Sequence, residues 1–132
     1  MQKQAKILVI DDDPDLQVSV KKVLESKSYE VISALDGDEG LRKVVEERPD
    51  LIILDVIMPG KHGFEVCHEL KTDPIYHFFS EIPVLMLTVY PGDREKAHLS
   101  MREGMMMEAE DYIQKPFDPQ ELLNRVEDLL KK

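Results

Sequence analysis

The chain has 132 residues, of which 42% are hydrophobic and 33% are charged, and its formal net charge is −10. This size suits one domain with a single core, and so acidic a chain without a basic stripe is not expected to bind nucleic acid directly. Its single cysteine, Cys67, excludes an internal disulfide, and no apolar run is long enough to cross a membrane, so we expect a cytoplasmic protein.

Apolar runs and helical periodicity alternate along the chain. Short continuous runs such as 6–10 (KILVI) and 51–54 (LIIL) are typical of strands buried on both faces of a sheet. Asp13 before Pro14 and Asp118 before Pro119 each predict a helix start, with a capping carboxylate followed by a proline at the first helical position. In chain order we expect a strand at 6–10, a helix from 14, a strand near a sheet edge at 29–34, a helix at 36–47, a strand at 51–54, a helix at 63–71, a long loop at 72–82, a strand at 84–87, a helix at 94–103, a short strand at 112–113 and a last helix from 119.

Apolar residues at helical spacing predict which side of each helix faces the core. In the helix at 36–47, Leu41, Val44 and Val45 are expected to point inward, and the helix must end before Pro49. The other inward-facing residues are expected to be Leu16, Val20, Val23 and Leu24 in the first helix, Phe64, Cys67 and Leu70 in the third, and Leu122, Leu123, Val126, Leu129 and Leu130 in the last.

Strand and helix alternate throughout, which predicts an α/β fold: a doubly wound, open parallel sheet with helices on both faces. Ligands bind such sheets beyond the carboxyl ends of the strands, where the strand order reverses. Polar residues that carry useful chemistry follow the predicted strands, and they are Asp11, Asp12, Asp55, Thr88 and Lys115.

Those side chains suit a phosphoryl transfer. Two carboxylates about 4 Å apart repel each other by roughly 4 kcal/mol at an effective dielectric near 20, so a cluster of Asp11, Asp12 and Asp55 requires a cation or protons. Hard oxygen ligands with room for water suit Mg²⁺. Lys115 supplies an ammonium and Thr88 a hydroxyl, and a carboxylate such as Asp55 can itself act as the nucleophile.

The motifs VIDD at 9–12, LDVIMPG at 54–60, LMLT at 85–88 and QKPF at 114–117 together resemble the response-regulator receiver domain of two-component signal transduction. The resemblance covers nearly the whole chain. It implies a flavodoxin-like (βα)5 fold with strand order 2-1-3-4-5. It also implies a single receiver domain over residues 1–132, with a core of about 5–131 and no output domain in this chain.

The resemblance further implies how the site works. Asp55 would accept a phosphoryl group from a sensor histidine kinase or a phosphotransfer protein. Mg²⁺ would be held by Asp12, by Asp55, by the backbone carbonyl of Ile57 and, through water, by Asp11. Partners downstream are not named by the sequence, and the protein is expected to be a monomer or a phosphorylation-dependent dimer.

Three further positions match the family's switch. Thr88 and Lys115 would bind the phosphate, and Tyr112, three residues before the lysine, matches the aromatic switch position. The Lys115–Pro116 peptide is expected to be cis, which a proline in the second position permits. The added charge of phosphorylation would then reshape the face made by the fourth helix, fifth strand and fifth helix.

Other functions remain as alternatives. A haloacid-dehalogenase-like phosphatase places a second aspartate two residues after the nucleophile, where this chain has Ile57, so we do not expect a turnover enzyme. A flavin-binding carrier needs a phosphate loop after the first strand, where this chain has DDDPD. A receiver-like interaction module that takes no phosphate is opposed by the complete set of site residues.

Four bulky side chains carry further expectations. Ile57 and Tyr90 are expected to slow the loss of phosphate from Asp55. Phe78 and Phe79 are expected either to cap the core or to contact a partner.

Overall fold

A computed structural model describes residues 4–89 and 108–131. Its centre is a parallel five-stranded sheet with the strand order β2-β1-β3-β4-β5, which confirms the expected α/β topology. The helix expected at 94–103 lies outside the described residues. The strands are β1 (Lys6–Ile10), β2 (Glu30–Ala34), β3 (Leu51–Asp55), β4 (Val84–Val89) and β5 (Asp111–Lys115).

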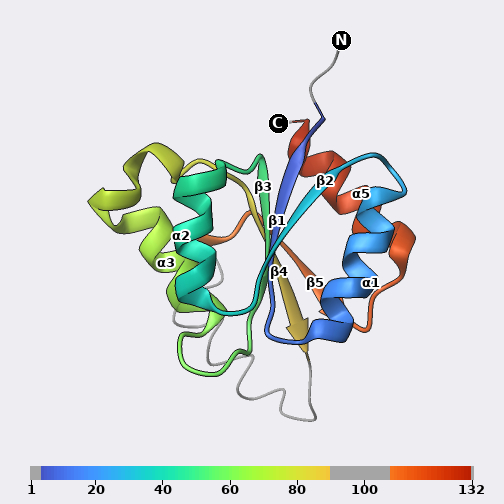
Figure 1. Cartoon of the computed structure of the whole chain (residues 1–132), viewed down its shortest axis with the longest axis horizontal. Helices are drawn as coiled ribbons and strands as arrows, with labels where there is room; N and C mark the ends of the chain where they lie inside the picture. The colour runs from blue at the N-terminus through green and yellow to red at the C-terminus, as the bar shows by residue number, and fades with distance from the viewer. Residues whose placement is uncertain (1–3, 90–107, 132) are drawn as a thin grey trace.

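The helices cover both faces of the sheet (Figure 1). Helices α1 (Pro14–Glu25) and α5 (Pro119–Leu130) lie on one face, and α2 (Gly37–Glu47) and α3 (Gly63–Thr72) lie on the other. The predicted caps are confirmed, because Asp13 accepts a hydrogen bond from the Asp15 N–H and Asp118 accepts one from the Gln120 N–H, each at 2.9 Å. Among the described residues, no helix is both long and apolar enough to cross a membrane.

Side-chain alternation along the strands divides the core into two layers. In β1, Ile7 and Val9 join the cluster under α1 and α5, whereas Leu8 and Ile10 join the cluster under α2 and α3. The first layer also contains Ile53 of β3, and the second contains Cys67, which is fully buried as a small core residue. The same alternation decides where polar side chains at the strand ends point.

The inward face of α2 differs from the expectation at one position. Val44 is fully buried, but Val45 is 43% exposed, so the prediction that Val45 faces the core was wrong. The buried stripe runs through Gly40, where an added Cβ would collide with the Ile10 side chain. Leu41 and Val44 continue this buried stripe, and Val45, one step of about 100° beyond Val44, therefore turns toward solvent.

The stretch at 72–82 is more ordered than the expected loop. Residue Thr72 completes α3, and a 3₁₀ helix, η1 (Pro74–Phe79), follows it. The start of η1 repeats the cap-then-proline pattern, with the Asp73 carboxylate accepting a hydrogen bond from the Ile75 N–H at 3.0 Å. Phe79 packs on the core layer under α2 and α3, whereas Phe78 is 91% exposed, so only Phe79 caps the core.

Candidate functional site

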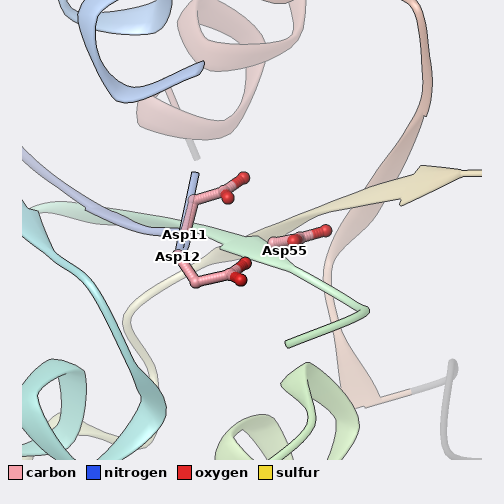
Figure 2. A group of neighbouring side chains, drawn as sticks. All are labelled: Asp11, Asp12 and Asp55. Carbon is pink, nitrogen blue, oxygen red and sulfur yellow. The ribbon is translucent and has the colours of Figure 1, made fainter. Parts of the chain in front are cut away.

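Strand register brings the aspartates together at the carboxyl edge of the sheet. Ile10, the last residue of β1, lies opposite Leu54 of β3, so Asp11 and Asp55 come next on neighbouring strands. Asp11 is fully buried and Asp55 is 4% exposed, while Asp12 is exposed. One carboxylate oxygen from each of the three lies within 4.8 Å of the others, and the three carboxylates point to the same side (Figure 2).

Lys115 completes this cluster from the far edge of the sheet. It is the last residue of β5, and its ammonium lies 3.3 Å from Oδ2 of Asp11 and 3.2 Å from Oδ1 of Asp55. Alternation places all three side chains on the sheet face that α1 and α5 cover, since Val9, Ile53 and Ile113 precede them by two residues on that face. The Lys115–Pro116 peptide is cis, as expected.

The cluster carries more negative charge than Lys115 neutralises. Burial and the nearby Asp11 carboxylate raise the pKa of Asp55 from 3.8 to about 6, against the lowering effect of Lys115. Burial also raises the pKa of Asp11. Three carboxylates beside one ammonium leave a deficit of positive charge that a divalent cation would offset, and hard carboxylate oxygens are ligands that Mg²⁺ prefers.

The loop after β3 is built to turn tightly against Asp55. Gly60 has a φ of +76°, and its backbone leads to Gly63 at the start of α3. Gly63 donates its N–H to the Val56 carbonyl at 2.9 Å, and an added Cβ on Gly63 would collide with the Asp55 carbonyl oxygen. Ile57 donates its N–H to Oδ1 of Asp55 at 3.4 Å, and the Ile57 side chain is 52% exposed.

Thr88 and Tyr112 lie on the opposite sheet face from Lys115. Thr88 is inside β4 and not after it, two residues beyond Met86, which belongs to the layer under α2 and α3. Its hydroxyl donates to the Ile113 carbonyl at 3.4 Å, and within the described residues it makes no hydrogen bond to the carboxylates. Tyr112 packs on the same layer, and burial raises the pKa of its hydroxyl to about 12. The side chain of Val89 and the whole of Tyr90 lie outside the described residues.

One polar residue of the site was missed by sequence reasoning. Gln17 of α1 is 7% exposed and, with Asp11 and Asp55, forms the complete set of buried polar side chains in the described part of the chain. Its amide nitrogen lies within hydrogen-bond distance of three backbone carbonyls near the carboxyl ends of β1 and β2. The available signal was its spacing, because Gln17 precedes Val20 and Leu24 by three and seven residues on an otherwise apolar stripe.

Comparison with known proteins assigns the family. The chain belongs to the response regulator receiver domain family, whose model matches residues 7–127. Members of this family are signalling switches of two-component systems. The fold and the carboxylate cluster described above therefore occur in a protein of the receiver class.

Curated relatives and solved structures agree with this assignment. The chain is 39% identical over 127 residues to the alkaline phosphatase synthesis transcriptional regulatory protein PhoP of Bacillus subtilis, a match that covers 96% of this chain and 49% of PhoP. It is 41% identical to the DNA-binding dual master transcriptional regulator RpaA of Synechocystis, again covering 96% of this chain and 49% of the relative. The chain thus spans about half the length of the curated relatives it matches.

Two solved structures of similar size give the same answer. A putative response regulator from Chloroflexus aurantiacus matches with a TM-score of 0.81 and 35% identity, covering 98% of this chain and all of that one. The chemotaxis protein CheY4 of Vibrio cholerae matches with a TM-score of 0.77 and 34% identity, covering 96% and 99% of the two chains.

Proposed function

We propose that this domain is a phosphorylation-activated switch in which Asp55 accepts a phosphoryl group from a sensor histidine kinase or a phosphotransfer protein. The observation that carries the proposal is the cluster of Asp11, Asp12 and Asp55 with Lys115 bridging Asp11 and Asp55. The cluster lies at the carboxyl edge of a parallel sheet, the usual ligand-binding edge of this fold. The receiver domain extends over about residues 5–131, and we expect it to work in the cytoplasm.

Mg²⁺ is the proposed cofactor. Asp12, Asp55 and the backbone carbonyl of Ile57 would hold it, and Asp11 would act on it through water. When bound, the ion would offset negative charge at the transferring phosphoryl group. The charge deficit of the described cluster supports a divalent cation at this position.

The chain's own groups suit the transfer step. A carboxylate oxygen of Asp55 forms a bond to phosphorus while the bond from phosphorus to the donor nitrogen or oxygen breaks, and the donor leaves with that electron pair. Lys115 already contacts Oδ1 of Asp55 and would pair with the added phosphoryl oxygens. Thr88 would turn its hydroxyl from the Ile113 carbonyl toward the phosphate.

The consequence would be a shift between two conformations and not catalytic turnover. Thr88 and Tyr112 share one face of the sheet, so movement of Thr88 toward a phosphate would change the space next to the Tyr112 ring. The proposed output surface is built from β5, α5 and the segment between β4 and β5. The domain would lose its phosphate slowly. The position two residues after Asp55, where a haloacid-dehalogenase-like phosphatase has its acid/base aspartate, is occupied here by Ile57, which cannot transfer a proton.

Downstream partners are proposed only by class. PhoP and RpaA are named as transcriptional regulators, and RpaA as DNA-binding. An acidic domain of this kind binds DNA poorly by itself. It would therefore signal through protein contacts, either with another protein or between two copies of the receiver.

Intact-mass measurement tests the proposal. Wild type incubated with Mg²⁺ and a small acyl-phosphate donor should gain one phosphoryl group, and Asp55→Asn should gain none. Chelation of Mg²⁺ should abolish the adduct on wild type. A folded, Mg²⁺-bound wild type that gains no phosphoryl group at any donor concentration would instead favour an interaction module that takes no phosphate.

A further inference from the structure

Gln17 makes an unusual set of contacts for a buried glutamine. Its side-chain nitrogen lies 3.1 Å from the Val9 carbonyl, 3.0 Å from the Asp11 carbonyl and 2.9 Å from the Ala34 carbonyl. These carbonyls come from β1, from the residue after β1, and from the end of β2. A single side chain of α1 thus ties together the two strands that end beside the carboxylate cluster.

The position would suit an apolar residue if packing were its sole role. Gln17 shares its stripe with Val20 and Leu24, which are both fully buried. Its side-chain oxygen, Oε1, is buried and has no hydrogen-bond partner in the described structure, a costly arrangement in a core. Because the side-chain oxygen makes no hydrogen bond, the presence of an amide at this position is explained by the hydrogen bonds that its N–H groups donate to backbone carbonyls.

The amide holds the peptide that joins the first two aspartates of the cluster. The Asp11 carbonyl belongs to the peptide plane between Asp11 and Asp12, so a hydrogen bond to it fixes how both side chains leave the backbone. The remaining polar groups of Asp11 are also engaged: its N–H donates to Ala34, and its carboxylate accepts from the Asp13 N–H and from Lys115. Gln17 completes this set from the side of α1.

We infer that Gln17 is a positioning residue, whose amide orients the Asp11–Asp12 peptide so that the carboxylates bind Mg²⁺ in the geometry phosphoryl transfer needs. The inference rests on the proposed function and adds a residue outside the ligand set. Partners that orient metal ligands typically change metal affinity by about 10- to 100-fold when removed.

A pair of substitutions on one helix separates positioning from general stability. Gln17→Met keeps the length of the side chain and removes its donors, whereas Val20→Ala, the matched control, weakens the same core layer without touching the cluster. We expect Gln17→Met to lower Mg²⁺ affinity, measured by calorimetry, by about tenfold or more. Val20→Ala should lower the urea midpoint yet leave the affinity within about twofold, consistent with additivity of separate sites.

A measurement on wild type keeps the inference testable if Gln17→Met does not fold. The side-chain amide NMR signals of Gln17 should shift on addition of Mg²⁺. Those of Gln120, whose side chain donates a hydrogen bond to Asn124 on α5, should not. Equal Mg²⁺ affinity in Gln17→Met and wild type, or a Gln17 amide that Mg²⁺ leaves unmoved, would overturn the positioning role alone. A wild type that binds no Mg²⁺ would overturn the proposed function together with it.

Discussion

Asp55 is a charged residue placed where charge is costly. It ends a strand whose other residues are all buried, and its carboxylate shares the site with Asp11. Lys115 offsets part of this cost through its contacts with both carboxylates. The incompletely neutralised Asp55 carboxylate therefore lowers the stability of the fold, and binding of a cation would offset this cost.

Replacing Asp55 should stabilise the metal-free domain. The pKa of Asp55 is about 6 in the fold and near 3.8 when unfolded, so the native state binds more protons between these values and stability falls as pH rises through them. Asp55→Asn should consequently be more stable than wild type by about 1–3 kcal/mol near pH 8, in the presence of a chelator. The difference should shrink toward about pH 4, because protonation then removes the wild-type charge.

Urea unfolding at the two pH values measures this effect. An advantage of Asp55→Asn that is equally large at both would show that the cost comes from packing and not from charge. Asp38→Asn is the control, since Asp38 is a solvent-exposed carboxylate outside the cluster, in the ion pair with Lys61.

Ile57 should govern how long a phosphoryl group survives on Asp55. It stands two residues after Asp55, is 52% exposed, and donates its N–H to the acceptor carboxylate. Ile57→Ala should open the approach for water and speed phosphate loss by roughly 2- to 10-fold, a barrier change of about 0.4–1.4 kcal/mol. The decay of the phosphorylated mass measures this, with Ile75→Ala on the remote η1 as control.

An unchanged lifetime in Ile57→Ala would contradict the shielding role. A faster decay in Ile75→Ala as well would point to a general loosening of the domain.

At the level of elements, the site depends on how closely α3 approaches β3. Gly63 begins α3 directly over the backbone of Asp55, and its N–H bonds to the Val56 carbonyl. The absence of a side chain at this position therefore sets where the helix starts relative to the acceptor.

Gly63→Ala should force these two segments apart. The new Cβ would meet the Asp55 carbonyl oxygen and the Val56 backbone, so we expect a loss of about 1–3 kcal/mol in unfolding free energy and slower phosphorylation. Gly60→Ala is the matched control: its Cβ would meet open space, and its positive φ alone should cost about 1 kcal/mol. A Gly63→Ala variant as stable as wild type in urea would contradict this account of the helix start.

For the whole molecule, binding of Mg²⁺ should stabilise the fold. A ligand that binds the native state alone, at about 100 times its dissociation constant, adds about 2.7 kcal/mol to the unfolding free energy. Wild type should therefore melt at a higher temperature with Mg²⁺ than with chelator. Asp12→Asn should lose this shift, whereas Asp15→Asn, an exposed carboxylate of α1 outside the cluster, should keep it. An equal shift in all three proteins would indicate a nonspecific salt effect.

Much of this architecture could be predicted because local rules point the same way. Apolar runs and proline-preceding caps defined most helices and strands, and strand-end polar residues identified Asp11, Asp12, Asp55 and Lys115. Strand order came from the family resemblance, since alternation alone does not fix which strands are neighbours. Residue-level errors arose where tertiary contacts decide: Val45 faces solvent because Gly40 draws α2 against Ile10.

Gln17 shows the limit of sequence reasoning most clearly. A glutamine within a helix has good intrinsic propensity and gave no cue on that basis. Its role depends on carbonyls from two strands, one of them 17 residues away along the chain, that meet only in the folded sheet.

We expect Asp55, and not a neighbouring carboxylate, to carry the phosphoryl group. Borohydride reduces an acyl phosphate to an alcohol, so treatment of the phosphorylated protein followed by peptide mass sequencing identifies the modified residue. Reduction is expected at Asp55 alone, within the peptide that contains residues 51–58. Reduction at Asp11 or Asp12, or a phosphorylated protein with no reduced aspartate at all, would contradict it.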